Sequence, residues 1–214
     1  NDATKMSDVA SLCEDIITSN LYSLEPNYAD IFDRQHEFGV ESIFEITYTE
    51  SSLQGWWQFG SGGGEGNVGT QFIGMRDYNG PTYATGWGFG RISTELVSAM
   101  SADPRFTHTV IDAASLQGAS YTAGYQNTGY FMKKYAPISA NAALDGDVAL
   151  NWGTNTRVIR YADVLLMAAE ANARTNSESV ALGYLNQVRN RVGLPAKNSS
   201  GTQLIDDIME ERRF

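Results

Sequence analysis

Cysteine, basic residues and long apolar runs are all scarce in this chain of 214 residues. The single cysteine, Cys13, excludes an internal disulfide and argues against a small disulfide-stabilised secreted fold. No apolar stretch approaches the roughly 20 residues that span a bilayer, and no signal peptide is visible. With 15 basic and 25 acidic residues the net charge is −10, which argues against partners such as nucleic acid or an anionic membrane surface.

Cys13 also lacks the surroundings of a lipid-anchored cysteine. Acidic Asp8 lies just upstream, and no apolar segment precedes it. We therefore expect a buried helix cysteine. With 42% hydrophobic residues the chain has enough apolar side chains for a sizeable core.

Apolar spacing predicts helices at both ends of the chain. Residues 6–19 carry one apolar face, and residues 156–174, 177–192 and 202–214 do the same, with Thr202 as an expected helix cap. Because only about two residues separate the second and third of these helices, we expect an antiparallel hairpin. Gly193 stands where a left-handed helix cap belongs.

The middle of the chain favours short elements and loops. Strands are expected at 42–48, 107–111 and 129–135, and a short helix at 92–100. Between residues 50 and 90 glycine alternates with aromatic residues, which predicts ordered loops packed by their own rings.

Exposed aromatic residues suit sugar binding, because the C–H face of a pyranose packs on an indole or phenol ring. Trp56 and Trp57 are adjacent, so in an extended segment only one of them would face a ligand. Tyr78 and Tyr83 flank a turn that is expected to lift them to the surface. The neighbouring polar groups are those of Arg76 and Asp77. These six residues are the predicted glycan site.

Catalytic and metal-binding patterns are weak. Acidic pairs such as Asp30 with Asp33 and Glu41 with Glu45 are what any acidic protein offers, and spacing alone does not place them across a cleft. His36 and His108 lie too far apart for a zinc pattern. We expect no enzymatic activity, no cofactor and no metal site.

Five segments together resemble the SusD-like (RagB/SusD) family of outer-membrane nutrient-binding proteins. The segments are Asn155–Ala171, Ala181–Pro195, Ile208–Arg213, Glu41–Ile46 and Asp103–Arg105. Their order and spacing carry the resemblance more than any one of them does.

The resemblance implies a mainly α fold with irregular loops and short β segments, built from helical hairpins of the TPR-like superhelix type. It predicts one domain portion over 1–214, with a helical end at 1–40, a loop-rich insertion at 41–155 and a hairpin region at 156–214. Because the chain opens inside a helical pattern and its final residues show no helix terminator, we expect a fragment of a longer protein. The resemblance implies that this fragment is a C-terminal-side portion.

The resemblance further implies a cell-surface lipoprotein of the outer membrane, held by a lipid anchor outside this chain. Its implied partners are a glycan ligand and a SusC-like TonB-dependent transporter. The alternatives are a protein-interaction scaffold, a peptide-binding member of the same uptake systems and, less favoured, a glycoside hydrolase. Burial of Trp56, Trp57, Tyr78 and Tyr83 would favour the scaffold.

Overall fold

The computed structural model describes residues 3–52, 55–58 and 64–214, which divide into two compact units. The first unit comprises Asn1–Glu45 with Arg157–Phe214, and the second comprises Ile46–Thr156. In the described ranges no helix is both long and apolar enough to cross a membrane.

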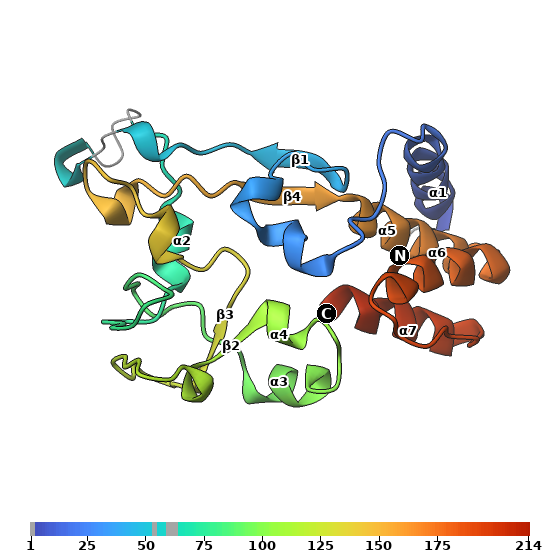
Figure 1. Cartoon of the computed structure of the whole chain (residues 1–214). Helices are drawn as coiled ribbons and strands as arrows, with labels where there is room; N and C mark the ends of the chain where they lie inside the picture. Colours follow the sequence, from blue (N-terminus) through green and yellow to red (C-terminus); the bar gives the residue numbers. More distant parts are fainter. Residues whose placement is uncertain (1–2, 53–54, 59–63) are drawn as a thin grey trace. The chain divides into compact units, whose positions relative to one another are not determined.

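The first unit is helical. Its helices are α1 (Ala3–Thr18), α5 (Tyr161–Arg174), α6 (Glu178–Arg191) and α7 (Gly201–Arg213). The predicted hairpin forms from α5 and α6, and α7 packs against both (Figure 1). Their shared core includes Leu165, Leu185, Leu204 and Ile208, which have no exposed surface. On the other side of α5, Cys13 packs with Val164 and Ala168, as expected of a buried helix cysteine.

Two details of this unit differ from the expectation. Residues 156–160 form strand β4 (Thr156–Arg160) instead of a first helical turn, and β4 pairs with β1 (Ser42–Ile46). The β-branched residues of β4 favour this strand once a partner is available. Helix α7 begins after Ser200, so Thr202 lies inside it and is not its cap. Gly193 has the predicted left-handed conformation, with φ +74°.

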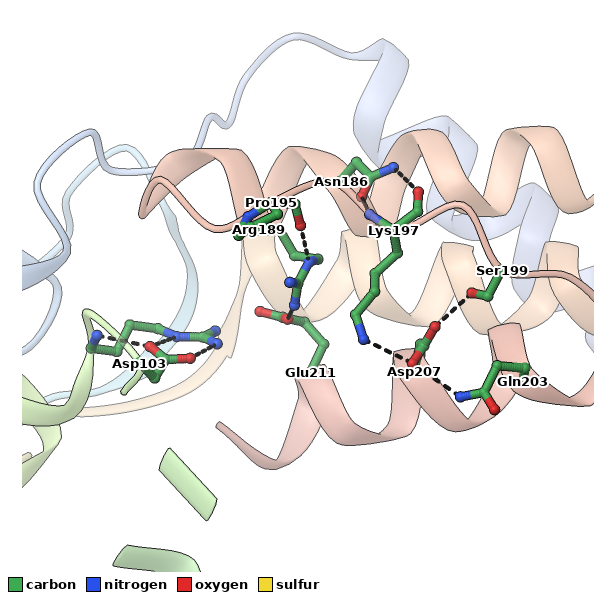
Figure 2. A network of polar contacts seen from close by, with 10 residues as sticks. Asp103, Asn186, Arg189, Pro195, Lys197, Ser199, Gln203, Asp207 and Glu211 are labelled. Atoms are coloured by element: carbon green, nitrogen blue, oxygen red, sulfur yellow. Dashed lines mark hydrogen bonds and ion pairs between the residues drawn. The ribbon is translucent and has the colours of Figure 1, made fainter. Parts of the chain in front are cut away.

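Ion pairs join the elements of the first unit. Arg189 contacts Glu211 at 2.7 Å across the α6–α7 pair (Figure 2). Arg160 contacts Asp163 at 3.5 Å. Arg191 contacts Glu41 at 2.8 Å.

Asp207 of α7 is held by three donors. It accepts hydrogen bonds from Lys197 Nζ at 2.9 Å, Ser199 Oγ at 2.6 Å and Gln203 Nε2 at 3.2 Å (Figure 2). Burial alone raises the pKa of Asp207, but the bonds from Ser199, Lys197 and Gln203 outweigh burial and hold the pKa below its ordinary value of 3.8.

The lowered pKa of Asp207 predicts a pH-dependent contribution to stability. The carboxylate stabilises the fold fully above its ordinary pKa, and this contribution is lost as the pH falls through the lowered pKa of the folded state. We expect Asp207→Asn to lower the free energy of unfolding at pH 7, and the difference from wild type to shrink below about pH 4. Urea unfolding of both proteins between pH 7 and pH 2.5 measures this difference in the free energy of unfolding. The matched control is Asp206→Asn at the exposed neighbour, and an equal effect there would contradict the prediction.

The second unit is rich in loops, with short elements between them. These are α2 (Val68–Ile73), α3 (Thr94–Met100), α4 (Phe106–Thr109), β2 (Val110–Asp112) and β3 (Tyr130–Met132). Strands β2 and β3 pair antiparallel, with Ile111 opposite Phe131. Helix α2 was not predicted, because its glycine and short length hide it in the glycine-rich stretch. Trp152 and Leu150 are fully buried here.

Candidate functional site

The site is built where the chain after α2 crosses the segment 86–89. A Cβ added to Gly86 would lie 2.3 Å from the Gly74 Cα, so both positions must be glycine for the two backbones to approach this closely. Four backbone hydrogen bonds then join the crossing segments: Gly86 to Met75, Trp87 to Gln71, Gly88 to Gly74 and Phe89 to Phe72, each from the N–H of the first residue to the carbonyl of the second. This crossing fixes where Trp87 and Phe89 lie.

Aromatic rings extend from the crossing in a continuous row. Trp56 stacks on Trp87 with ring centroids 5.9 Å apart, Phe72 meets Trp87 edge-on at 4.7 Å, and Phe72 contacts Phe89 at 5.7 Å. We call these four residues the aromatic strip. Trp56 is 52% exposed, Phe72 43% and Phe89 65%. Contiguous exposed aromatic surface of this kind marks an interaction site.

A pocket of about 240 Å³ adjoins the strip. Its walls include two rings of the strip, a third exposed ring and several polar groups: Trp87, Phe89, Tyr125, Arg76, Arg91 and Asn127. Tyr125 is 83% exposed. Flat rings beside hydrogen-bonding side chains are the surroundings that a sugar needs, because its faces are apolar and its edge is polar.

Trp56 and Trp57 are both exposed, Trp57 to 82%. They lie in a turn of 3₁₀ helix, Trp56–Gln58, and not in the expected extended segment, and neither ring is buried. The Trp57 ring folds back over Gly55, where an added Cβ would lie 2.7 Å from the indole nitrogen.

The expected exposure of Tyr78 and Tyr83 is also wrong. Each is 8% exposed, and the two rings pack edge to face in the core with Met75 and Phe131. Burial, followed by the neighbouring Tyr78, raises the pKa of the Tyr83 phenol. These tyrosines belong to the core cluster that also contains Phe131, a residue of the pocket lining.

Arg76 and Asp77 are adjacent in sequence but have different surroundings. Arg76 lines the pocket, whereas Asp77 is exposed, has a left-handed backbone with φ +49°, and is not among the lining residues. The six predicted residues therefore divide into two exposed tryptophans, one pocket arginine, one acidic residue beside it and two core tyrosines.

Several residues of the site were not predicted as such. The alternation Gly86-Trp87-Gly88-Phe89 was a usable signal, because glycines let the backbone bend, as it does at Gly88 with φ +78°, and leave the two rings as the large side chains of the segment. Nothing in the sequence marked Gln71 as a residue of the site. It is buried, accepts from Trp152 Nε1 at 3.1 Å, donates to the Thr85 carbonyl at 3.1 Å, and its own carbonyl accepts from Trp87. It therefore links the core to the strip.

The acidic pairs considered for catalysis have structural partners. Asp30 and Asp33 lie 3.8 Å and 3.5 Å from the His36 ring nitrogens, and Glu41 and Glu45 contact arginines. Across residues 3–52, 55–58 and 64–214, no group of three His, Cys, Asp or Glu side chains is arranged to hold a metal ion.

A sequence model described as the SusD family matches residues 40–214, so the chain belongs to the SusD family. SusD-like protein P25 of Formosa agariphila is 26% identical over 84% of this chain and 37% of its own length. A SusD-like protein of Bacteroides ovatus is 36% identical over 46% of this chain and 18% of its own. These matches confirm the predicted family.

Solved structures agree with this assignment. Surface glycan-binding protein A from Bacteroides thetaiotaomicron, in complex with laminarihexaose, is 34% identical, with a TM-score of 0.88 over 99% of this chain and 47% of that chain. A laminarin binding SusD-like protein is 39% identical, with a TM-score of 0.82 over 90% of this chain and 42% of that chain. The predicted fold class is confirmed. The chain spans less than half the length of these relatives.

Proposed function

We propose that this chain is the glycan-binding part of a cell-surface capture protein, which holds an oligosaccharide on the aromatic strip without cleaving it. The observation that carries the proposal is a row of contacting rings, exposed Trp56, Phe72 and Phe89 around half-buried Trp87, beside a polar pocket. The similar surface glycan-binding protein A, whose structure contains laminarihexaose, supports a sugar ligand.

Membership of the SusD family supports the wider setting of the proposal. In that setting the protein is a lipoprotein of the outer membrane. The captured glycan passes to a SusC-like TonB-dependent transporter. The scaffold alternative expects all four predicted aromatic residues to be buried. Tyr78 and Tyr83 are buried, but Trp56 and Trp57 are exposed, so this alternative is less favoured.

A paired substitution of Trp56 and Trp57 by alanine tests the binding face. We expect at least about tenfold weaker binding, because each lost ring removes on the order of 1 kcal/mol of stacking. Stability should change little, since both side chains are exposed. Isothermal titration with laminarihexaose, and a glycan array to find other ligands, measure the binding.

The control is Phe38→Ala, which removes an equally prominent ring, 65% exposed, from the first unit. Unchanged affinity in the tryptophan double variant would contradict the binding face. Release of reducing ends from a bound oligosaccharide would contradict the non-enzymatic part of the proposal.

A further inference from the structure

Two arginines of the pocket differ from the other arginines of the chain. Arg105, Arg157, Arg160, Arg174, Arg189, Arg191 and Arg212 lie in ion pairs. Among the described residues, the guanidinium groups of Arg76 and Arg91 make neither an ion pair nor a hydrogen bond. An acidic chain offers carboxylates in plenty, so two unpaired arginines in one place require an explanation.

The fold brings these two arginines into the same pocket from separate segments. The backbone of Arg76 bridges to Gly86 at the glycine crossing, and that of Arg91 bridges to Phe131 of β3. Both side chains line the pocket, and its described lining contains no carboxylate. The pocket therefore holds two formal positive charges against aromatic walls.

Arg76 is exposed and Arg91 is half-buried, and their two positive charges in one pocket repel each other. An anionic group that contacts both guanidinium groups offsets this repulsion, and it accepts hydrogen bonds in which donor and acceptor are both charged, which a neutral sugar hydroxyl cannot do. The guanidinium group has five donors and no acceptor, so it suits carboxylate or sulfate oxygens.

We propose that the Arg76–Arg91 pocket binds the anionic substituent, carboxylate or sulfate, of an acidic glycan whose sugar rings lie on the aromatic strip. This inference rests on the proposed glycan-binding function. The pocket volume of about 240 Å³ lies below the range of about 300–1,000 Å³ typical of sites for whole drug-sized ligands. It therefore suits one substituted sugar ring of a longer chain.

The test compares oligosaccharides that differ only in charge. The probes are laminarihexaose and its sulfated form, and manno- and galacto-oligosaccharides with the corresponding oligomannuronate and oligogalacturonate. Titrations with the full chain are expected to show at least tenfold tighter binding of one acidic probe than of its neutral counterpart. The preference should fall as salt rises from about 0.05 M to 0.5 M, because salt screens charges in a solvated pocket.

Arg76→Gln and Arg91→Gln are each expected to reduce the ratio of acidic to neutral affinity several-fold, and the double variant to bring it near one. Lys133→Gln is the matched control, since it removes one positive charge from an exposed position of the same unit outside the described pocket lining. Thermal unfolding shows whether the variants remain folded.

The outcomes separate this inference from the function on which it rests. If neutral and acidic partners bind equally, or if Lys133→Gln lowers the ratio as much as the pocket variants do, the anionic pocket is wrong while glycan binding stands. If no probe and no array glycan binds, the proposed function itself is overturned. Preference for sulfated over carboxylated probes, or the reverse, identifies the substituent.

Discussion

Replacing Glu41 by glutamine is expected to lower the free energy of unfolding by about 3–5 kcal/mol. Glu41 is 4% exposed, and its carboxylate accepts hydrogen bonds from Arg160 Nη1 at 2.9 Å, Arg191 Nη1 at 2.8 Å and the Glu25 N–H at 2.7 Å. Its own backbone carbonyl also accepts from Tyr161 N at 2.8 Å. Removing the shared negative charge leaves two largely buried guanidinium groups without their common counter-ion, which is the costly way to break a buried ion pair.

Urea unfolding of the Glu41→Gln variant at neutral pH measures this loss. The control is Glu210→Gln at an exposed position of α7, where we expect a change within about 0.5 kcal/mol. A loss below about 1 kcal/mol for Glu41→Gln would show that the cluster contributes less than its geometry indicates.

Trp152→Ala is the second large expected effect, about 3–5 kcal/mol of destabilisation. Its side chain has no exposed surface, and the surrounding residues cannot fill the space of a lost indole. The milder Trp152→Phe keeps most of the volume but removes the bond from Nε1 to Gln71 Oε1. We expect it to cost about 1–3 kcal/mol, because the buried amide of Gln71 loses a donor.

The same substitution of tryptophan by alanine at an exposed position provides the comparison for Trp152→Ala. Trp57→Ala should leave the free energy of unfolding within about 0.5 kcal/mol of wild type but weaken glycan binding, so the two tryptophans separate stability from recognition. Denaturant unfolding and titration on both variants measure the two quantities. Equal destabilisation by the two variants would contradict the assigned burial.

The helices were predictable because their signals are local. Apolar spacing located α1, α5, α6 and α7, and the Gly193 cap depends on neighbours in sequence. The strand at 156–160 was not predictable in this way, since its conformation depends on pairing with β1, more than 100 residues earlier. Local periodicity contains no information about such a partner.

The site shows the same division between local and distant causes. The glycine-rich stretch indicated aromatic loops, and both Trp56 and Trp57 are exposed although only one of them was expected to face a ligand. The turn between Tyr78 and Tyr83 does lie at the surface, but the two tyrosines were wrongly expected to be exposed with it. Asn79 bridges to Ser120 and Tyr83 to Ile138, so segments about 40–55 residues later hold the turn against the rest of the unit. The pairing state of an arginine likewise depends on the folded surroundings, and Arg91 gave no sign of it in sequence.

The close contact of Gly74 with Gly86 affects how the aromatic strip binds a ligand. Because no side chain separates the two backbones, Trp87 and Phe89 are positioned during folding and need no rearrangement when a polymer arrives. A surface that is already ordered loses little conformational entropy on association. For the proposed glycan ligand, weak contacts with successive sugar units of a long chain can therefore add up, while each single unit still detaches quickly.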